Sequence, residues 1–267
     1  MNNAKQKLLP KFEPIASHPG APVIQRDASV WTLRLNRPDA HNRLDPLDVD
    51  ALLTLFTQPF ETGNPVALVI TGNESRSFSS GYTLDAIMSE LDGRFEKMLD
   101  ALEALPFLTI AAINGNIFGG ATDMALSCDI RIGQIGTRLL MPAAGIGLHY
   151  YSGGLRRYVT RLGLGTASRL MLTGLPMPAE DLLRVGYLTD LVEADKMPTA
   201  VQVYTEAAKL TAPAVVAQMK ANMLAIADPM HTDETLADTI SGAYHASVKS
   251  DELASRVNNM LKKNSKK

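Results

Sequence analysis

The chain has 267 residues, of which 46% are hydrophobic and 20% charged, and its formal net charge is −2. This composition is typical of a globular protein with one large domain, or one domain and an appendage. The nearly neutral charge provides no basic field to attract nucleic acid. The single cysteine, Cys128, excludes an internal disulfide and a multi-thiolate metal site, so we expect no metal and an inert, packed thiol.

The N-terminal residues contain no apolar stretch long enough for a signal peptide, and no apolar run in the chain approaches transmembrane length. We therefore expect a soluble cytoplasmic protein that does not contact a membrane. Residues 1–21 include Pro10, Pro14 and Pro19 and are expected to form a loose N-terminal arm.

Strands and helices alternate over the next part of the chain. Val30–Leu35 alternates apolar and polar residues and predicts a strand. Asp45 and Pro46 predict a helix start, as N-cap and first helical residue, and Pro59 predicts the end of that helix. The further predicted elements are a buried strand at 66–70, a polar loop at 71–82, a helix at 95–105, a strand at 109–113, a short helix at 121–126, a strand at 129–133, a glycine-rich loop at 145–154 and a helix from residue 155.

The last part of the chain predicts helices only, at 199–210, 213–227 and 232–262. Strands that alternate with helices indicate an α/β fold, which we place at residues 22–198. The helical region, 199–267, must bury its apolar stripes on this core or on a partner subunit. The arginines of the helix from residue 155 are expected on solvated polar faces, with anion binding as the alternative; they are Arg156, Arg157, Arg161 and Arg169.

The stretch Ile110–Asp129 carries the strongest local signal for a site. An apolar strand ends at a glycine turn, and Gly119 and Gly120 then open a helix that carries one acid, Asp123. The unpaired N–H groups at such a helix start favour negative charge, including charge that develops on a carbonyl oxygen. Two interpretations are open at this point: a site that uses these groups, or glycines that allow close packing beside a capping or solvated acid.

Several motifs, in the same order along the chain, resemble the crotonase, or enoyl-CoA hydratase/isomerase, superfamily. The resemblance runs from about residue 22 to about residue 225. The motifs are Leu35-Asn36-Arg37-Pro38 with Asn42-Arg43-Leu44, Phe78-Ser79-Ser80-Gly81, Ala112-Ile113-Asn114-Gly115 with Gly119-Gly120, Cys128-Asp129-Ile130-Arg131, Pro142 with Gly147 and Gly153-Gly154, Leu172-Thr173-Gly174, and Ala179-Glu180-Asp181 with Gly186-Tyr187-Leu188.

This resemblance implies a spiral of ββα repeats followed by an all-helical trimerisation region, with trimers or dimers of trimers. It implies an acyl-CoA thioester as substrate and no cofactor apart from the coenzyme A that the substrate carries. The thioester oxygen would lie between the backbone N–H groups of Tyr82 and Gly120, which would stabilise an enolate or a tetrahedral oxyanion. The positions implied to line the substrate site are His41, Arg43, Ser80, Gly81, Tyr82, Leu84, Gly119, Gly120 and Ala143.

Hydratases of this superfamily use two glutamates, and neither is present here. Asp123 stands at the first position and Ala143 at the second. Water addition needs one group to activate water and another to deliver a proton, whereas isomerisation needs one carboxylate that moves a proton between two carbons. The sequence therefore favours an isomerase over a hydratase, with Asp123 as the acid/base. The resemblance also implies that the enzyme acts in fatty-acid metabolism.

Two alternatives remain. His149 or a tyrosine of the same loop, such as Tyr151, would serve an atypical member that decarboxylates or hydrolyses a C–C bond. The same residues would otherwise only shape an acyl pocket. Ala143 motivates the other alternative, a protein that binds acyl-CoA without catalysis.

Overall fold

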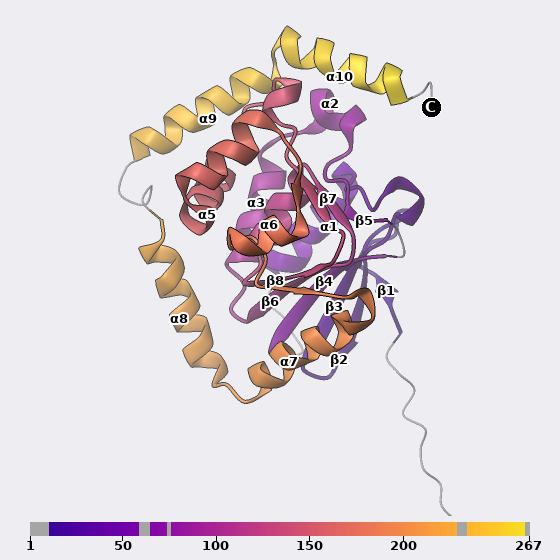
Figure 1. Ribbon diagram of the computed structural model, residues 1–267, viewed down its shortest axis with the longest axis vertical. Helices are drawn as coiled ribbons and strands as arrows, with labels where there is room; N and C mark the ends of the chain where they lie inside the picture. Colours follow the sequence, from indigo (N-terminus) through magenta and orange to yellow (C-terminus); the bar gives the residue numbers. More distant parts are fainter. Residues whose placement is uncertain (1–10, 59–64, 74–75, 229–233, 265–267) are drawn as a thin grey trace, which may run out of the picture.

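The computed structural model describes residues 11–58, 65–73, 76–228 and 234–264. Two β-sheets and the helices around them form its body, and the last helices run along its outside (Figure 1). The predicted helix end at Pro59 and the first two residues of the helix predicted from 232 lie outside the described residues, as does much of the N-terminal arm.

The larger sheet has seven strands in the order β1-β2-β3-β4-β6-β8-β11. The pairs from β3 to β11 are parallel, whereas β1, β2 and β3 pair antiparallel. Five-residue or longer strands form its centre, and short ones its edges. The bounds are β1 Glu13–Pro14, β2 Val23–Asp27, β3 Val30–Leu35, β4 Ala67–Gly72, β6 Leu108–Ile113, β8 Ile130–Gln134 and β11 Asp190–Val192.

The smaller sheet has four short strands in the order β10-β9-β7-β5. Their bounds are β5 Ser77–Ser79, β7 Asn116–Phe118, β9 Arg138–Leu140 and β10 Met177–Pro178. The chain alternates between the sheets: each of β4, β6 and β8 is followed by one strand of the smaller sheet and then by a helix. This is the ββα spiral that the sequence predicts.

Ten α-helices are described, and α8, α9 and α10 lie in turn along the outside of the molecule (Figure 1). The long helix α5 is kinked at Gly163. The bounds are α1 Pro46–Thr57, α2 Ile87–Glu90, α3 Gly93–Glu103, α4 Gly120–Leu126, α5 Ser152–Thr173, α6 Ala179–Arg184, α7 Met197–Lys209, α8 Pro213–Ile226, α9 Glu234–Val248 and α10 Asp251–Asn264.

The central strands are buried on both faces, and alternate residues enter two different cores. In β4, Leu68 and Ile70 join the main core, whereas Val69 joins a smaller core that includes Met197 of α7. Ile110 of β6 also lies in the smaller core. Successive side chains of a strand point to opposite faces of a sheet, so a strand covered on both sides must be apolar throughout. This explains the uniformly apolar run at 66–70.

The structure corrects four predictions of local structure. The polar loop at 71–82 contains strand β5, because a three-residue strand with serines has no apolar pattern. Helix α3 begins at Gly93, where the Asp92 side chain accepts the Arg94 N–H at 2.9 Å as an N-cap. The helix predicted from Leu155 begins three residues earlier, at Ser152.

The C-terminal helix predicted as one element is two helices. α9 ends at Val248 and α10 begins at Asp251. Between them the Ser250 hydroxyl oxygen accepts the Leu253 N–H at 3.1 Å, which satisfies one free donor at the start of α10. Serine competes with the helical backbone in this way, so it favours a helix start over a helix interior.

Candidate active site

The segment around Tyr82 is fixed against the chain at His41 to Leu44. The Ser80 N–H donates to His41 O at 2.8 Å, the Leu44 N–H to Gly81 O at 2.8 Å, and the Thr83 N–H to Leu44 O at 2.9 Å. The Tyr82 N–H lies between these bonded groups and donates to no oxygen of the described residues. The two segments therefore hold one unpaired donor in a fixed place.

Helix α4 brings a second unpaired donor beside the first segment. Gly81 has φ +81°, and a Cβ atom on it would lie 2.6 Å from Phe118 O and 2.8 Å from the Gly120 nitrogen. Only glycine permits this backbone shape together with so close an approach. The Gly119 N–H donates to Leu140 O at 2.9 Å, but the Gly120 N–H has no acceptor among the described residues. Tyr82 and Gly120 are both half-buried, so solvent reaches their surroundings.

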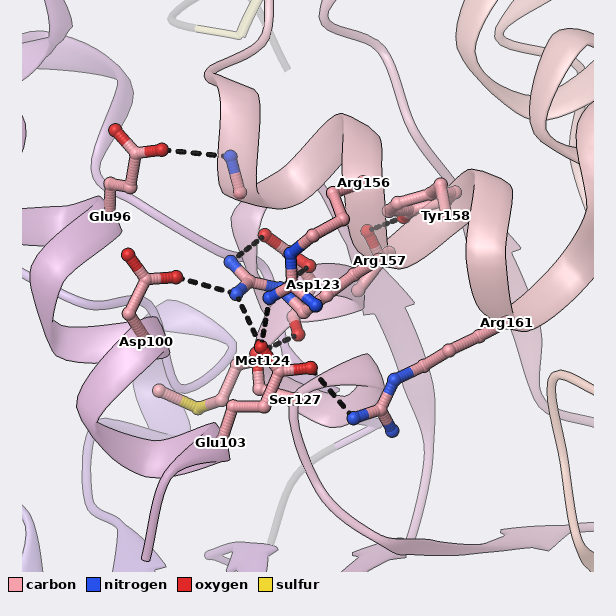
Figure 2. A network of polar contacts seen from close by, with 12 residues as sticks. Glu96, Asp100, Glu103, Asp123, Met124, Ser127, Arg156, Arg157, Tyr158 and Arg161 are labelled. Atoms are coloured by element: carbon pink, nitrogen blue, oxygen red, sulfur yellow. Dashed lines mark hydrogen bonds and ion pairs between the residues drawn. The ribbon is translucent and has the colours of Figure 1, made fainter. Parts of the chain in front are cut away.

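Asp123 lies one turn into α4 and is completely buried. Arg157 of α5 is also completely buried. It donates two hydrogen bonds to the Asp123 carboxylate, from Nε to Oδ1 at 2.9 Å and from Nη2 to Oδ2 at 3.1 Å (Figure 2). The Tyr151 hydroxyl donates to Oδ2 at 2.5 Å. Both carboxylate oxygens therefore already accept hydrogen bonds inside the protein, and the pair is bidentate, the strongest geometry for these groups.

These contacts shift the affinity of the neighbouring groups for protons. Burial acts to lower the pKa of Arg157, but the Asp123 carboxylate outweighs burial and raises that pKa well above its usual value. Burial, and then the charge of Asp123, raise the pKa of Tyr151 well above that of a free tyrosine. Arg157 is therefore charged, and Tyr151 is a neutral phenol that donates a hydrogen bond to the carboxylate.

Arg157 is also the centre of a larger ionic cluster that joins α3 to α5 (Figure 2). Its Nη1 donates to Asp100 at 2.7 Å and to Glu103 at 3.2 Å. Glu103 accepts from Arg156 as well, and from Arg161 at 2.7 Å. Burial opposes ionisation of Glu103, but the attraction of Arg157, Arg161 and Arg156 outweighs it and lowers the pKa of this carboxyl.

The expectation that the arginines of this helix lie on solvated faces is thus wrong for the side chain of Arg157, which is 0% exposed. Arg156 is also mostly buried, at 10% exposed. Sequence alone did not separate Arg157 from its neighbours because its partners come from other helices. The one available signal is that the buried acid Asp123 needs a cation.

The other predicted site residues divide into those near Asp123 and those away from it. Ala143 is buried in the main core. His149 is exposed, and its backbone N–H donates to the Ser247 hydroxyl of α9 at 2.8 Å; its ring makes no polar contact with Asp123 in the part of the chain that the structure describes. Tyr151, by contrast, is brought into direct contact with Asp123.

Four of the other residues expected to line the substrate site lie in or next to the segments around Tyr82 and His41. Arg43 is 42% exposed and pairs with Asp45 at 2.9 Å. His41 is exposed and has a left-handed backbone, with φ +53°. The Ser80 hydroxyl faces Ala40 O at 3.5 Å, and Leu84 is half-buried.

Cys128 is fully buried, as expected of a packed thiol, and burial raises the pKa of its thiol to about 12. Within the described residues, no three His, Cys, Asp or Glu side chains gather in a way that suits a metal ion. None of the described helices is both long and apolar enough to cross a membrane.

Comparison with known proteins shows where this fold and this order of motifs recur. Residues 25–255 match the family model described as enoyl-CoA hydratase/isomerase. The chain is 30% identical over 182 residues to a short-chain-enoyl-CoA hydratase from Clostridium acetobutylicum, a match that covers 66% of this chain and 70% of the relative.

Solved structures also share this fold, and two of them illustrate it. One is a methylmalonyl-CoA decarboxylase complexed with 2S-carboxypropyl CoA, with a TM-score of 0.82 and 20% identity over 93% of this chain and 97% of the other. The second is an enoyl-CoA hydratase from Mycobacterium avium subsp. paratuberculosis K-10, with a TM-score of 0.78 and 22% identity over 91% and 99%. The match over most of the chain, together with the ββα spiral, shows that this protein belongs to the enoyl-CoA hydratase/isomerase family, the crotonase superfamily.

Proposed function

We propose that the protein binds an acyl-CoA thioester and stabilises its enolate with the backbone N–H groups of Tyr82 and Gly120. The observation that carries this proposal is the contact of Gly81 with Gly120, which holds two unpaired donors side by side at a half-buried place. Fixed donors of this kind stabilise a developing oxyanion, and loss of one costs about 3–4 kcal/mol in comparable sites. Family membership supports the thioester as ligand.

Within this proposal, Asp123 is the acid/base. It lies one turn beyond Gly120 and is the acidic residue that α4 carries. Because Oδ2 already accepts the Tyr151 hydroxyl, proton transfer requires Tyr151 to share or release that oxygen. A buried, hydrogen-bonded carboxylate of this kind has a fixed orientation. It therefore favours proton transfer to or from a substrate carbon that is held in one position.

The preference for isomerisation over hydration rests on Ala143. This alanine stands where hydratases of the superfamily have their second glutamate, so no carboxylate is present at that position. Several relatives are named hydratases, including 2,3-dehydroadipyl-CoA hydratase of Escherichia coli at 29% identity, so the relatives do not support that preference. A carboxylate that carries one proton from the α to the γ carbon of an enoyl thioester needs no second acid. Isomerisation therefore stays the reaction we favour.

A second candidate is an acyl-CoA binder without turnover. It is favoured by the complete engagement of Asp123, whose two oxygens are bonded to Arg157 and Tyr151, together with Ala143. Decarboxylation or C–C hydrolysis through His149 is less favoured, because that side chain is exposed and separate from Asp123.

The family's trimeric assembly is also part of the proposal. Helix α8 buries only Lys220 among its residues, although much of its sequence is apolar. Val215, Met219 and Met223 are more than half exposed, and Ile226 is 86% exposed. A helix that is apolar on several sides needs cover, and a second and third copy of the chain would supply it.

The experiment compares the wild type with Asp123→Ala and Asp123→Asn on 2-enoyl-CoA and 3-enoyl-CoA substrates, with acyl-CoA binding measured by calorimetry in parallel. We expect wild-type turnover and a loss of at least about 100-fold in both variants with binding retained. The Asn variant keeps the side-chain volume beside Arg157, and circular dichroism of both variants establishes that they fold. Unchanged turnover would reject Asp123 as acid/base, whereas wild-type binding without turnover of any substrate would support the second candidate.

A further inference from the structure

Phe95 of α3 is a buried aromatic side chain that no prediction from sequence placed in the site. It is 3% exposed. Its ring stands edge to face with Tyr82, at a centroid distance of 5.7 Å and an angle of 80°. It makes a second edge-to-face contact with Tyr151, at 6.1 Å and 69°. The ring therefore spans the space between the residue that supplies one proposed oxyanion donor and the residue that binds Asp123.

The same ring also packs directly on Gly120. A Cβ atom built on Gly120 would lie 2.5 Å from Cζ and 2.9 Å from Cε1 of Phe95. No real Cβ atom approaches so closely, so the ring touches the backbone at the second proposed donor. Phe95 thus contacts Tyr82 and Gly120, which supply the two proposed oxyanion donors, and Tyr151, which is bonded to the proposed acid/base Asp123.

The wall continues beyond Phe95 with other buried rings. Tyr150 stacks on Tyr151, with ring centroids 4.3 Å apart, and Tyr244 of α9 stands edge-on to Tyr151 at 6.0 Å. Tyr244 is 3% exposed and Tyr150 is 7% exposed. Two cavities of about 150 and 280 Å³ lie elsewhere, against α8, and neither is lined by any of these aromatic residues. An acyl chain that enters past Tyr82 and Gly120 would meet the rings of Phe95, Tyr151 and Tyr150.

We propose that Phe95 determines acyl specificity: its ring bounds the space beside Tyr82, Gly120 and Tyr151 and restricts the ligand to short acyl-CoA thioesters. This inference rests on the proposed function, because it takes the space beside Tyr82 and Gly120 to hold the acyl group. A rigid ring in contact with backbone cannot move aside without a shift of α3. Longer chains are excluded because they would have to displace it.

The test measures binding of butyryl-CoA and octanoyl-CoA by isothermal titration calorimetry. For the wild type we expect butyryl-CoA to bind the more tightly. In Phe95→Ala the ratio of the two dissociation constants should shift toward octanoyl-CoA by at least about tenfold, and Phe95→Leu should give an intermediate shift. The Leu variant preserves most of the core volume, and circular dichroism of both variants establishes that they fold.

Phe107→Ala is the matched control. Phe107 is 4% exposed, precedes β6 and lines the smaller cavity near α8. The Phe107→Ala variant therefore removes a similar buried ring away from the site. The ratio of the two dissociation constants in Phe107→Ala should equal that of the wild type. Equal wild-type binding of the two thioesters, or an unchanged ratio in folded Phe95→Leu and Phe95→Ala, would overturn the role of Phe95 while leaving acyl-CoA binding intact. Absence of binding of both thioesters by the wild type would instead overturn the proposed function, and this inference with it.

Discussion

Arg157 and Asp123 form a bidentate ion pair in which both side chains are completely buried, with Nε 2.9 Å from Oδ1 and Nη2 3.1 Å from Oδ2. The pair ties α5 to α4 and fixes the carboxylate beside the proposed oxyanion donors. A buried ion pair contributes little net stability compared with apolar packing, but removal of one partner leaves an uncompensated charge. Its role here is to fix the position of Asp123.

Replacement of Tyr151 by phenylalanine removes one donor to Asp123 and preserves the ring contacts. Among the residues that the structure describes, Arg157 then remains as the donor to Oδ2. If Asp123 is the acid/base, we expect kcat on the favoured enoyl-CoA to fall by about 10- to 100-fold, because the carboxylate loses one of the two groups that orient it, with the KM for the thioester nearly unchanged. Steady-state kinetics over a range of substrate concentrations provide the measurement.

Tyr158→Phe is the control for that prediction. Its hydroxyl is also fully buried, but it is bonded to the Thr122 hydroxyl at 2.5 Å instead of to Asp123. Loss of a buried hydroxyl of this kind costs about 1 kcal/mol of stability in either variant. An equal fall in kcat for the two variants would show that Tyr151 has no special relation to Asp123.

Gly81→Ala should push the two proposed donors apart. The backbone at Gly81 has φ +81°, and the added methyl would lie 2.8 Å from the Gly120 nitrogen. We expect a loss of about 1–3 kcal/mol from backbone strain, and in addition a large loss of acyl-CoA binding as Tyr82 and Gly120 are pushed apart. Urea unfolding and calorimetric titration with butyryl-CoA measure the two effects separately.

The matched variant for this test is Gly136→Ala. Gly136 has φ +87°, but a Cβ atom on it would meet nothing within 4 Å. The Gly136→Ala variant therefore introduces a similar backbone strain without a collision. Butyryl-CoA should bind this variant as it binds the wild type, and equally tight binding by Gly81→Ala would argue against an oxyanion site at Tyr82 and Gly120.

Glu103→Gln should destabilise the protein in a pH-dependent way. The folded-state pKa of Glu103 is lowered by its arginine partners, so the charged carboxylate stabilises the fold above the unfolded-state pKa, near about 4.3. That contribution disappears as the pH falls through the folded-state value. We expect a cost of about 3 kcal/mol at pH 7, which shrinks below about pH 4.

Urea unfolding of the wild type and Glu103→Gln, at neutral pH and near pH 3.5, measures this difference. Asp195→Asn is the control, because Asp195 pairs with Lys196 on the surface at 72% exposure and should contribute little at either pH. A destabilisation by Glu103→Gln that is the same at both pH values would mean that volume or hydrogen bonding, rather than charge, explains it.

The apolar residues of α8 predict self-association. We expect the wild type to be a trimer or a dimer of trimers, and Met219→Asp with Met223→Asp to give smaller species, because two charges would be placed on the surface that packs against another copy. Size-exclusion chromatography with light scattering provides the mass. Ile135→Asp, at an exposed apolar residue in the turn after β8, should leave the mass unchanged; a monomeric wild type would contradict the prediction.

The sequence determined the features that depend on neighbouring residues. Strand β3 occupies the predicted Val30–Leu35, and α1 begins at Pro46, because alternation and N-capping act within a few residues. Gly81 and the pair at Gly119 and Gly120 were recognisable as places where the backbone must turn or approach closely. The family and its ββα order followed from such motifs in sequence.

Only the tertiary structure decided which side chains meet. Asp123 and Arg157 are 34 residues apart, and Phe95 lies on a different helix from both, so no local pattern joins them. The local sequence around an acid or an arginine in a helix is the same whether the side chain faces water or a buried partner. The cost of its burial depends on which groups the fold places opposite it. The position of the catalytic candidate was therefore visible in the sequence, whereas its charge partner and the aromatic wall around it came from the packing of α3, α4 and α5.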